Sequence, residues 1–219
     1  MMSPKAAAIC FGLVVLAFML TGCMEQGAIQ TGADNPLTVE GLTPSVKDKH
    51  AGLVAITPSF EITKYKVIAV EKFPVTDTAV QDGEDRQFAD KMSGILQVEL
   101  VRRLRESKLF DHVVNVGDGQ YTASTGQPTL RLQGVVTRLG RGDRALRMWV
   151  GGGAGAARTQ AEMRFVDVQT GKVVMATADR RIAKIGGGSS DLMGEAYDDM
   201  ARDLGRFLVR LSRGEAPQD

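Results

Sequence analysis

The sequence predicts an α+β domain in which two helices pack on one face of a mixed, largely antiparallel sheet, in the order β-α-β-β-β-β-α. Three observations support this prediction. Two long segments repeat apolar residues every three or four positions, as amphipathic helices do. Short β-branched segments lie between them, and the polar turn 169–172 joins two of these into a hairpin. Two such helices and a sheet bury their apolar surfaces by stacking as layers.

The expected elements follow one another along the chain. The segment 65–73 is β-branched and partly alternating, which favours a strand, and Pro74 ends it. A helix is expected over about 86–107, after the acidic turn 82–85, whose charges suit the positive end of the helix dipole. The remaining expected elements are strands over 109–116, 130–138, 161–168 and 173–185, and a final helix over about 191–212.

Both expected helices have an apolar stripe that needs a partner surface. The residues of the first stripe are Phe88, Met92, Ile95, Leu96, Leu100 and Leu104, and those of the second are Met193, Ala196, Met200, Leu204, Phe207, Leu208 and Leu211. We predict that the second helix is structural, because a lone helix could not leave this stripe in water. Its other side is predicted to be a solvated charged face, formed by Asp198, Arg202, Asp203, Arg206 and Arg210.

The first 22 residues are predicted to be a lipoprotein signal peptide. After Lys5, an apolar run from Ala6 to Leu20 has the length of a signal-peptide core and is shorter than the roughly 20 residues of a membrane span. The run ends in a lipobox, Leu20-Thr21-Gly22-Cys23, whose small residues give a signal peptidase access to the bond before the cysteine. We therefore expect cleavage before Cys23 and a palmitate-type acyl anchor on its thiol.

The residue after the lipidated cysteine indicates which membrane anchors a lipoprotein. In Gram-negative lipoproteins an aspartate there commonly signals retention in the inner membrane, and this chain has Met24 instead. The sequence therefore favours anchoring in the outer membrane, facing the periplasm. Because Cys23 is the one cysteine left after cleavage and is acylated, we expect no intrachain disulfide.

The mature chain is predicted to have three parts. Residues 23–64 are expected to be a lipid-anchored flexible tether, because they contain scattered glycines and prolines and no sustained periodicity, although 53–56 could pair as an edge strand. As a coil, about 40 residues would span roughly 35 Å. The globular domain is expected over 65–212, and residues 213–219 are expected to be a disordered tail.

The chain contains few of the residue types that most catalytic sites use. The chain has two cysteines and two histidines, and it contains no G-x-S-x-G motif and no calcium-loop spacing. The glycine runs 151–155 and 186–188 lack a Walker or dinucleotide pattern, so flexible or close-packed backbone is the favoured interpretation. A weaker anion site at the N-terminus of the last helix stays open. We expect no enzyme activity, no catalytic residues, no metal and no cofactor.

The charge pattern indicates few partners. A net charge of +1 gives no overall field that would attract nucleic acid, so no nucleic-acid partner is expected. A basic segment in a glycine-containing connection includes Arg138, Arg141, Arg144 and Arg147. The favoured interpretation is a solvated loop, and the alternative is contact of Arg141, Arg144 and Arg147 with phosphate or carboxylate groups of the envelope.

Several segments, taken in order, resemble a known family. They are the lipobox, the strand 67–70, the helix end 105–110, the strand 130–136, and the segments 153–155, 167–174 and 186–188. Over about 65–211 they resemble the lipoproteins catalogued as domain of unknown function 4410, a group similar in turn to the curli-secretion lipoprotein and to penicillin-binding-protein-activator lipoproteins. The resemblance implies a periplasmic α+β domain without catalytic residues. A pore is not expected, because no pair of roughly ten-residue alternating strands is available as membrane hairpins.

Together these features predict a membrane-anchored envelope lipoprotein that acts as a non-catalytic binding or assembly module. Its expected partners are the lipid bilayer, through acylated Cys23, and an envelope protein or a second copy of the chain. The alternatives are an envelope enzyme such as a hydrolase, and a subunit of a secretion channel. An enzyme would need a polar pocket with perturbed acids, and a channel would need a ring and membrane hairpins.

Overall fold

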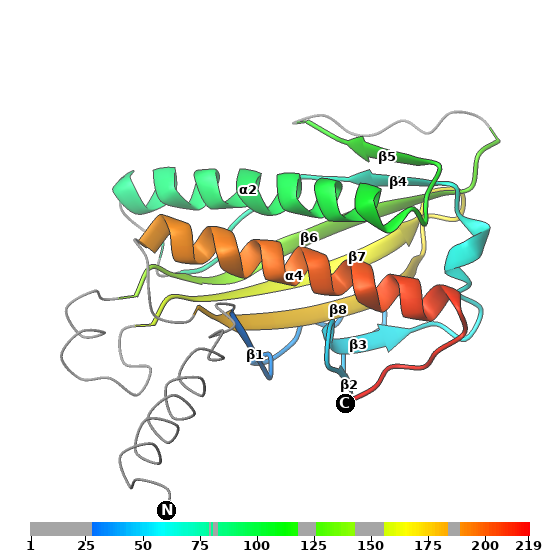
Figure 1. The fold of residues 1–219 in the computed structure, drawn as a ribbon, viewed down its shortest axis with the longest axis horizontal. Coiled ribbons are helices and arrows are strands. Elements are labelled where there is room, and N and C mark those ends of the chain that lie inside the picture. The colour runs from blue at the N-terminus through cyan, green and yellow to red at the C-terminus, as the bar shows by residue number, and fades with distance from the viewer. Residues whose placement is uncertain (1–27, 79, 81–82, 118–125, 143–155, 184–188) are drawn as a thin grey trace, which may run out of the picture.

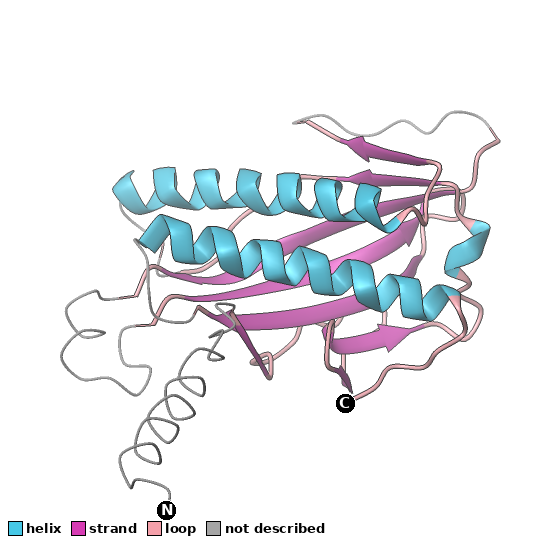
Figure 2. Ribbon diagram, in the orientation of Figure 1, coloured by secondary structure: helices cyan, strands magenta, loops and turns pink. Residues whose placement is uncertain are grey.

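The computed structural model describes residues 28–78, 80, 83–117, 126–142, 156–183 and 189–219. Two long helices lie side by side on one face of a single sheet (Figures 1 and 2). The expected α+β class and the order β-α-β-β-β-β-α are confirmed from residue 67 onward. The elements are β1 (Ile29–Thr31), β2 (Val46–Asp48), β3 (Gly52–Ile56), the 3-10 helix η1 (Ile62–Lys64), β4 (Val67–Val70), α2 (Gly83–Ser107), β5 (His112–Asn115), β6 (Thr129–Gly140), β7 (Arg158–Asp167), β8 (Val173–Ile182) and α4 (Ser189–Ser212).

The described strands form one eight-stranded sheet in the order β2-β3-β8-β7-β6-β4-β5, with β1 paired to β8 beside this path. β4 is parallel to both of its neighbours, and the other pairs are antiparallel. The expected hairpin between β7 and β8 is confirmed. Its turn is closed by Asp167, whose Oδ1 accepts hydrogen bonds from the backbone N–H groups of Gln169 and Thr170, and Gly171 supplies the positive φ of 71° that the turn requires.

The core lies between the sheet and the two helices. The stripes of both helices are buried, with Met92 and Leu96 of α2 and Tyr197 and Phe207 of α4 fully enclosed against sheet residues such as Phe165. The expectation that the last helix is structural is therefore confirmed. A hydrogen bond of 3.3 Å joins the Tyr197 hydroxyl to the Thr159 hydroxyl inside this core, and burial raises the pKa of Tyr197 to about 12.

The expected flexible tether is wrong over residues 28–64, although the expectation that 53–56 could pair as a strand is confirmed by β3. β3 pairs with one half of β8 and β1 with the other half, and Val54 of β3 is completely buried. Gly52, at a φ of 73°, lets β3 approach the Ala178 carbonyl so closely that a Cβ there would collide with it. The reason for the error is physical: strands of three to five residues are too short to show a period, and the β8 residues that pair with β1 and β3 are more than 100 residues away.

The C-terminal residues were expected to be a disordered tail, and this is also wrong. The backbone N–H of Gln218 donates to the Asp48 carboxylate at 2.9 Å, and its carbonyl accepts from the Lys49 N–H at 2.7 Å. The tail therefore lies against the end of β2. The sequence alone does not predict this contact, because the contact depends on the buried carboxylate of Asp48, about 170 residues earlier in the chain.

Candidate functional site

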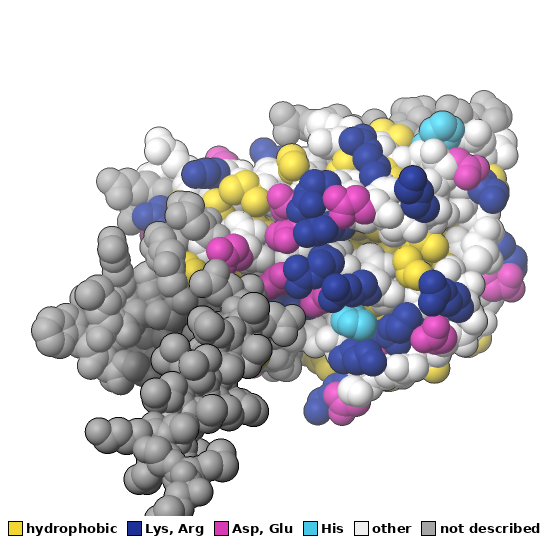
Figure 3. Space-filling model, viewed as in Figure 1, with side chains coloured by type: hydrophobic (Ala, Val, Ile, Leu, Met, Phe, Trp, Pro, Cys, Tyr) yellow, Lys and Arg dark blue, Asp and Glu magenta, His cyan; other side chains and the backbone are white. Residues whose placement is uncertain are grey.

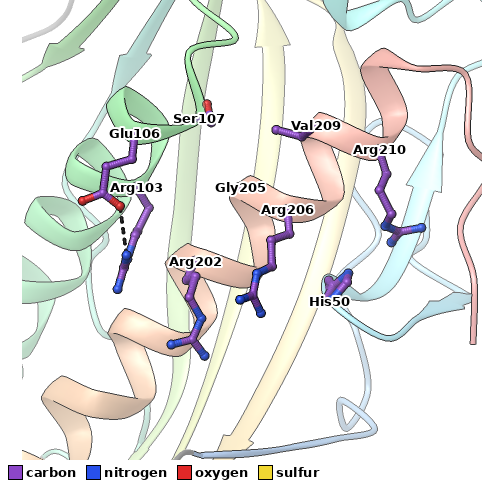
Figure 4. Close-up of a pocket in the computed structure, with 9 residues that line it drawn as sticks. All are labelled: His50, Arg103, Glu106, Ser107, Arg202, Gly205, Arg206, Val209 and Arg210. Carbon is purple, nitrogen blue, oxygen red and sulfur yellow. Dashed lines mark hydrogen bonds and ion pairs between the residues drawn. The ribbon is translucent and has the colours of Figure 1, made fainter.

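A groove of about 490 Å³ lies on the helix face, between the last turns of α2, the C-terminal half of α4 and the turn between β2 and β3 (Figure 4). It lies on the face where basic and acidic side chains form a band over the two helices (Figure 3). Arginine supplies most of its polar lining, which makes it the candidate binding site. The lining residues are His50, Arg103, Glu106, Ser107, Arg202, Gly205, Arg206, Val209 and Arg210.

Helical spacing brings the arginines of α4 together. Arg202, Arg206 and Arg210 are four residues apart, so their side chains leave the same side of the helix. In Figure 4 they extend from α4 in one direction, and His50 lies beside Arg210. The rotation of α4 is fixed by its buried stripe, in which Phe207 is completely enclosed, so the arginines must face outward.

On the α4 side, each arginine is held by a more deeply buried carboxylate. Arg202 pairs with Asp199 at 2.5 Å, Arg206 with Asp203 at 3.1 Å, and Arg210 with Asp48 at 2.6 Å. The three acids have side-chain exposures of 9%, 11% and 0%, whereas Arg202 and Arg206 are 35% and 57% exposed. The acids thus form the floor of this side, the guanidinium groups of Arg202 and Arg206 form its surface, and Arg210, 13% exposed, lies deeper.

Asp48 organises the end of the groove. Its Oδ1 accepts from the N–H groups of His50 and Ala51, which shapes the turn between β2 and β3, and its Oδ2 accepts from Arg210 and from the N–H of Gln218. Burial by itself would raise the pKa of Asp48, but these hydrogen bonds, that from Arg210 foremost, hold it below its ordinary value. The carboxylate is therefore ionised at neutral pH and keeps Arg210 in place.

The α2 side carries a mixed network. Arg103 donates to both oxygens of Asp198, at 2.8 and 2.7 Å, and to Glu106 at 2.9 Å. Arg102 also pairs with Asp198 and with Glu106. Burial disfavours the charge of Arg103, yet its hydrogen bonds to Asp198 and Glu106 raise its pKa. This network joins α2 to α4 and holds the two walls of the groove at a fixed separation.

In the described part of the chain, several groove residues have buried side-chain nitrogens without a hydrogen-bond partner. Arg202 Nε and both Nε and Nη1 of Arg210 are buried without a hydrogen-bond partner, as is His50 Nδ1, among the residues that the structure describes. A buried polar group left unpaired costs about 1–3 kcal/mol. Burial lowers the pKa of His50, against the opposing effect of Asp203, so its imidazole is neutral at pH 7.

A buried ionic cluster fixes the groove to the sheet. Arg181 of β8 donates to both oxygens of Asp179, to Asp203 at 2.9 Å and to the His50 carbonyl at 3.1 Å. Burial opposes the charge of Arg181, but Asp179 and Asp203 raise its pKa. Breaking a buried pair of this kind costs about 3–5 kcal/mol. The β8 strand, α4 and the β2–β3 turn are therefore locked together beneath the groove.

The N-terminal segment meets the groove at its edge. The backbone N–H of Ala28 donates to Asp199 Oδ2 at 2.6 Å, and Arg202 pairs with Oδ1 of the same carboxylate. Ala28 follows Cys23 by five residues. One carboxylate thus links the beginning of the described chain to the first arginine of the groove.

The candidate residues of the sequence analysis fall elsewhere. Arg141 lies near the N-terminal end of α2, 3.4 Å from Asp85 and over the ring of Phe88 at 4.3 Å. Along α2, Asp85 and Arg103 are about 27 Å apart, so Arg141 does not join the groove. Outside the described residues lie Leu20, Thr21, Gly22, Cys23, Arg144, Arg147 and both glycine runs.

The groove arginines were predicted as a solvated face. Their four-residue spacing was the available signal, but it does not say what lies opposite them. Arg103 and His50 come from distant parts of the chain, and only the packing of α2 and of the β2–β3 turn against α4 brings them to the same place. Within the described ranges, no helix is long and apolar enough to cross a membrane, and no three His, Cys, Asp or Glu residues are grouped to hold a metal ion.

Comparison with known proteins identifies the family. The sequence model described as Domain of unknown function (DUF4410) matches residues 56–187, more than half of the chain. The chain belongs to this family. The matched DUF4410 region includes α2 but ends before α4, so the three α4 arginines and His50 lie outside it. No curated protein was found to match the chain.

Solved structures show a weaker likeness. A PelC dodecamer from Paraburkholderia phytofirmans is 15% identical, with a TM-score of 0.45, and the match covers 69% of this chain and 94% of that one. A Xanthomonas campestris protein of the family model DUF330 is 13% identical, with a TM-score of 0.42, over 76% of this chain and 90% of that one. At these scores no property of either protein is carried over to this DUF4410 chain.

Proposed function

We propose that the chain is a lipid-anchored, non-catalytic binding module of the bacterial cell envelope. The observation that carries this is the short distance between the lipobox and the fold. Cys23 precedes Ala28 by five residues, and the Ala28 N–H is hydrogen bonded to Asp199 of α4. Five extended residues span at most about 18 Å. A chain acylated at Cys23 therefore keeps its domain next to the bilayer instead of on a long flexible tether.

The groove supports binding more than catalysis. Its arginines are fixed by carboxylates, which is how a protein preorganises a surface for an anionic ligand. Glu162 is, with Asp179, one of the two described carboxylates whose pKa burial raises, which is what a general acid would need. Its two oxygens accept from the Gln160 amide and the Leu37 N–H, so it ties the N-terminal segment to the sheet. An envelope hydrolase and a secretion-channel subunit remain the alternatives.

The anchor is tested by replacing the lipidated cysteine. With Cys23→Ala we expect no incorporation of a fatty-acid analogue and accumulation of a precursor that keeps its signal peptide. Cys10→Ala is the matched control, because it removes a thiol from the apolar run but leaves the lipobox intact. Envelope fractionation and labelling measure both effects. Equal labelling of the Cys23→Ala chain and the wild type would contradict the proposal.

The binding role is tested on the acylated chain in its own envelope. Crosslinking followed by pull-down should recover a partner of the module, an envelope protein or a second copy of the chain. Hydrolysis of envelope ester or glycan substrates by the purified full chain would favour the enzyme alternative instead.

A further inference from the structure

We propose that the arginine groove binds phosphate groups of lipid headgroups in the membrane that anchors the chain, so that the helix face lies against the bilayer. This inference rests on the proposed anchor at Cys23. It adds to that anchor a second contact, made by Arg202 and Arg206 of α4.

The chemistry of the exposed groups fits phosphate. A guanidinium group presents a planar fork of N–H donors that matches two phosphate oxygens. Arg206 is 57% exposed and pairs with Asp203 at 3.1 Å through Nη1, which leaves the outer side of its guanidinium toward the groove. Arg202, 35% exposed, is the next arginine along α4. The two together offer a paired anion contact at the surface.

The arrangement of charges favours an anion approaching from outside. The carboxylates of Asp48, Asp199 and Asp203 are nearly or completely buried, beneath the arginines that they hold. On the α4 side, an incoming group therefore meets guanidinium groups first, whereas the α2 side also presents the carboxylate of Glu106, which is 50% exposed.

The position of the groove selects the membrane as the source of phosphate. Ala28 and Arg202 share the carboxylate of Asp199, and the predicted acylation site is five residues before Ala28. The acyl chains at Cys23 are thus attached within about 18 Å of Ala28, which lies at the edge of the groove. A volume of about 490 Å³ accommodates a headgroup.

Protection of Arg206 from phenylglyoxal, which modifies exposed guanidinium groups, tests the assignment. The acylated full chain is placed in vesicles of phosphatidylcholine, in vesicles containing phosphatidylglycerol, in detergent, and in detergent with inorganic phosphate. Peptide mass spectrometry follows Arg206 and, as an internal reference, Arg164, which is exposed on β7 and lines no part of the groove. We expect Arg206 to be modified several times more slowly in phosphatidylglycerol vesicles than in detergent, with Arg164 unchanged.

Matched variants sharpen this measurement. With Arg206→Gln, protection is followed at Arg202, and the fraction of phosphatidylglycerol needed for half protection should rise about fivefold, the factor that one basic residue contributes at an anionic surface. Arg164→Gln, which removes the same charge outside the groove, should leave this fraction unchanged. An equal effect of the two substitutions would mean that only overall charge matters, and it would overturn the groove assignment.

The remaining outcomes distinguish a membrane from other sources of the anion, and the groove proposal from the anchor proposal. Full protection by inorganic phosphate with none from vesicles would overturn the membrane assignment in favour of a small free anion. Protection that appears only after envelope proteins are added would overturn it in favour of an acidic protein. The mass of the N-terminal peptide reports acylation separately. An acylated chain with an unprotected Arg206 refutes the groove and leaves the anchor, whereas an unacylated chain still protected by vesicles refutes the anchor and leaves the groove.

Discussion

The α4 helix and the N-terminal segment 28–64 contribute to the same fold in opposite ways. α4 carries its structure in its own sequence, since an apolar stripe at three- and four-residue spacing determines which side is buried. The N-terminal segment has short strands and a 3-10 helix without such a pattern. Its place is determined by contacts with β8 and α4, far along the chain. Local pattern predicts the first kind of element, and it misses the second.

Polar contacts hold much of the N-terminal segment. Asp34 pairs with Arg180 and accepts through its carbonyl from Gln160, and the Leu37 N–H donates to Glu162. The Val173 N–H donates to the Glu40 carboxylate. Each contact alone is modest, at about 0.5–1.5 kcal/mol. Their sum, together with buried Val54, makes the segment part of the domain.

Removal of residues 28–64 from the mature chain should have the largest effect. The deletion exposes one edge of β8 and takes away the buried side chains of Val54 and Ile62, worth about 1.5–3 kcal/mol each. It also leaves Arg210 without Asp48. Against a total of about 5–15 kcal/mol, we expect loss of cooperative unfolding in a thermal melt followed by circular dichroism. A cooperative melt at an unchanged midpoint would mean that the segment is a tether and not part of the domain.

The rest of the fold shows where sequence reasoning works. The helices over 83–107 and 189–212 and the β7–β8 hairpin were predicted within a few residues, because amphipathic spacing and turn residues are local properties. The α+β class followed from their order. The start of the domain was misplaced, because Gly52 and Val54 have no local feature that marks them as partners of β8.

Phe207→Ala tests the α4 half of the comparison. Phe207 is fully buried between α4 and the sheet, and truncation of such a side chain costs about 3–5 kcal/mol. Val98→Ala is the control, because Val98 is a helix residue that is 54% exposed, and it should change the free energy of unfolding by less than about 0.5 kcal/mol. Urea unfolding gives both values. Similar midpoints for the two variants would mean that the stripe does not stabilise the fold.

The candidate site depended even more on tertiary structure. The sequence shows Arg202, Arg206 and Arg210 at helical spacing, and this pattern is equally typical of any solvated helix face. They line a groove because Arg103 and His50, which are about 100 and 150 residues away in the sequence, lie opposite them in the fold. The possible anion contact named from the sequence, as the alternative to a solvated loop, was Arg141, Arg144 and Arg147. Of these, Arg141 packs against Phe88 at the other end of α2, and the other two lie outside the described residues.

Asp48→Asn should have the smallest of these effects. Asp48 belongs to the N-terminal segment and pairs with Arg210 of α4, so the substitution tests a contact between the two regions. The amide keeps one oxygen for two of the four hydrogen bonds of Asp48, but its NH₂ group would face the donors Arg210 and Gln218. Losing a charge-assisted hydrogen bond costs about 1.5–3 kcal/mol, and we expect a loss of that size at pH 7. Asp219→Asn, at a side chain 81% exposed, is the control and should have no measurable effect.

The pH dependence of this difference identifies its cause. The pKa of Asp48 is lower in the folded protein than its ordinary value of 3.8, so its contribution is complete above that pH and is lost as pH falls through the folded pKa. The wild type and Asp48→Asn should therefore differ equally at pH 7 and pH 5, and the difference should shrink below pH 3.8. Urea unfolding at a series of pH values measures this. A difference that stays constant down to the acid limit would show that Asp48 acts through its shape and not through its charge.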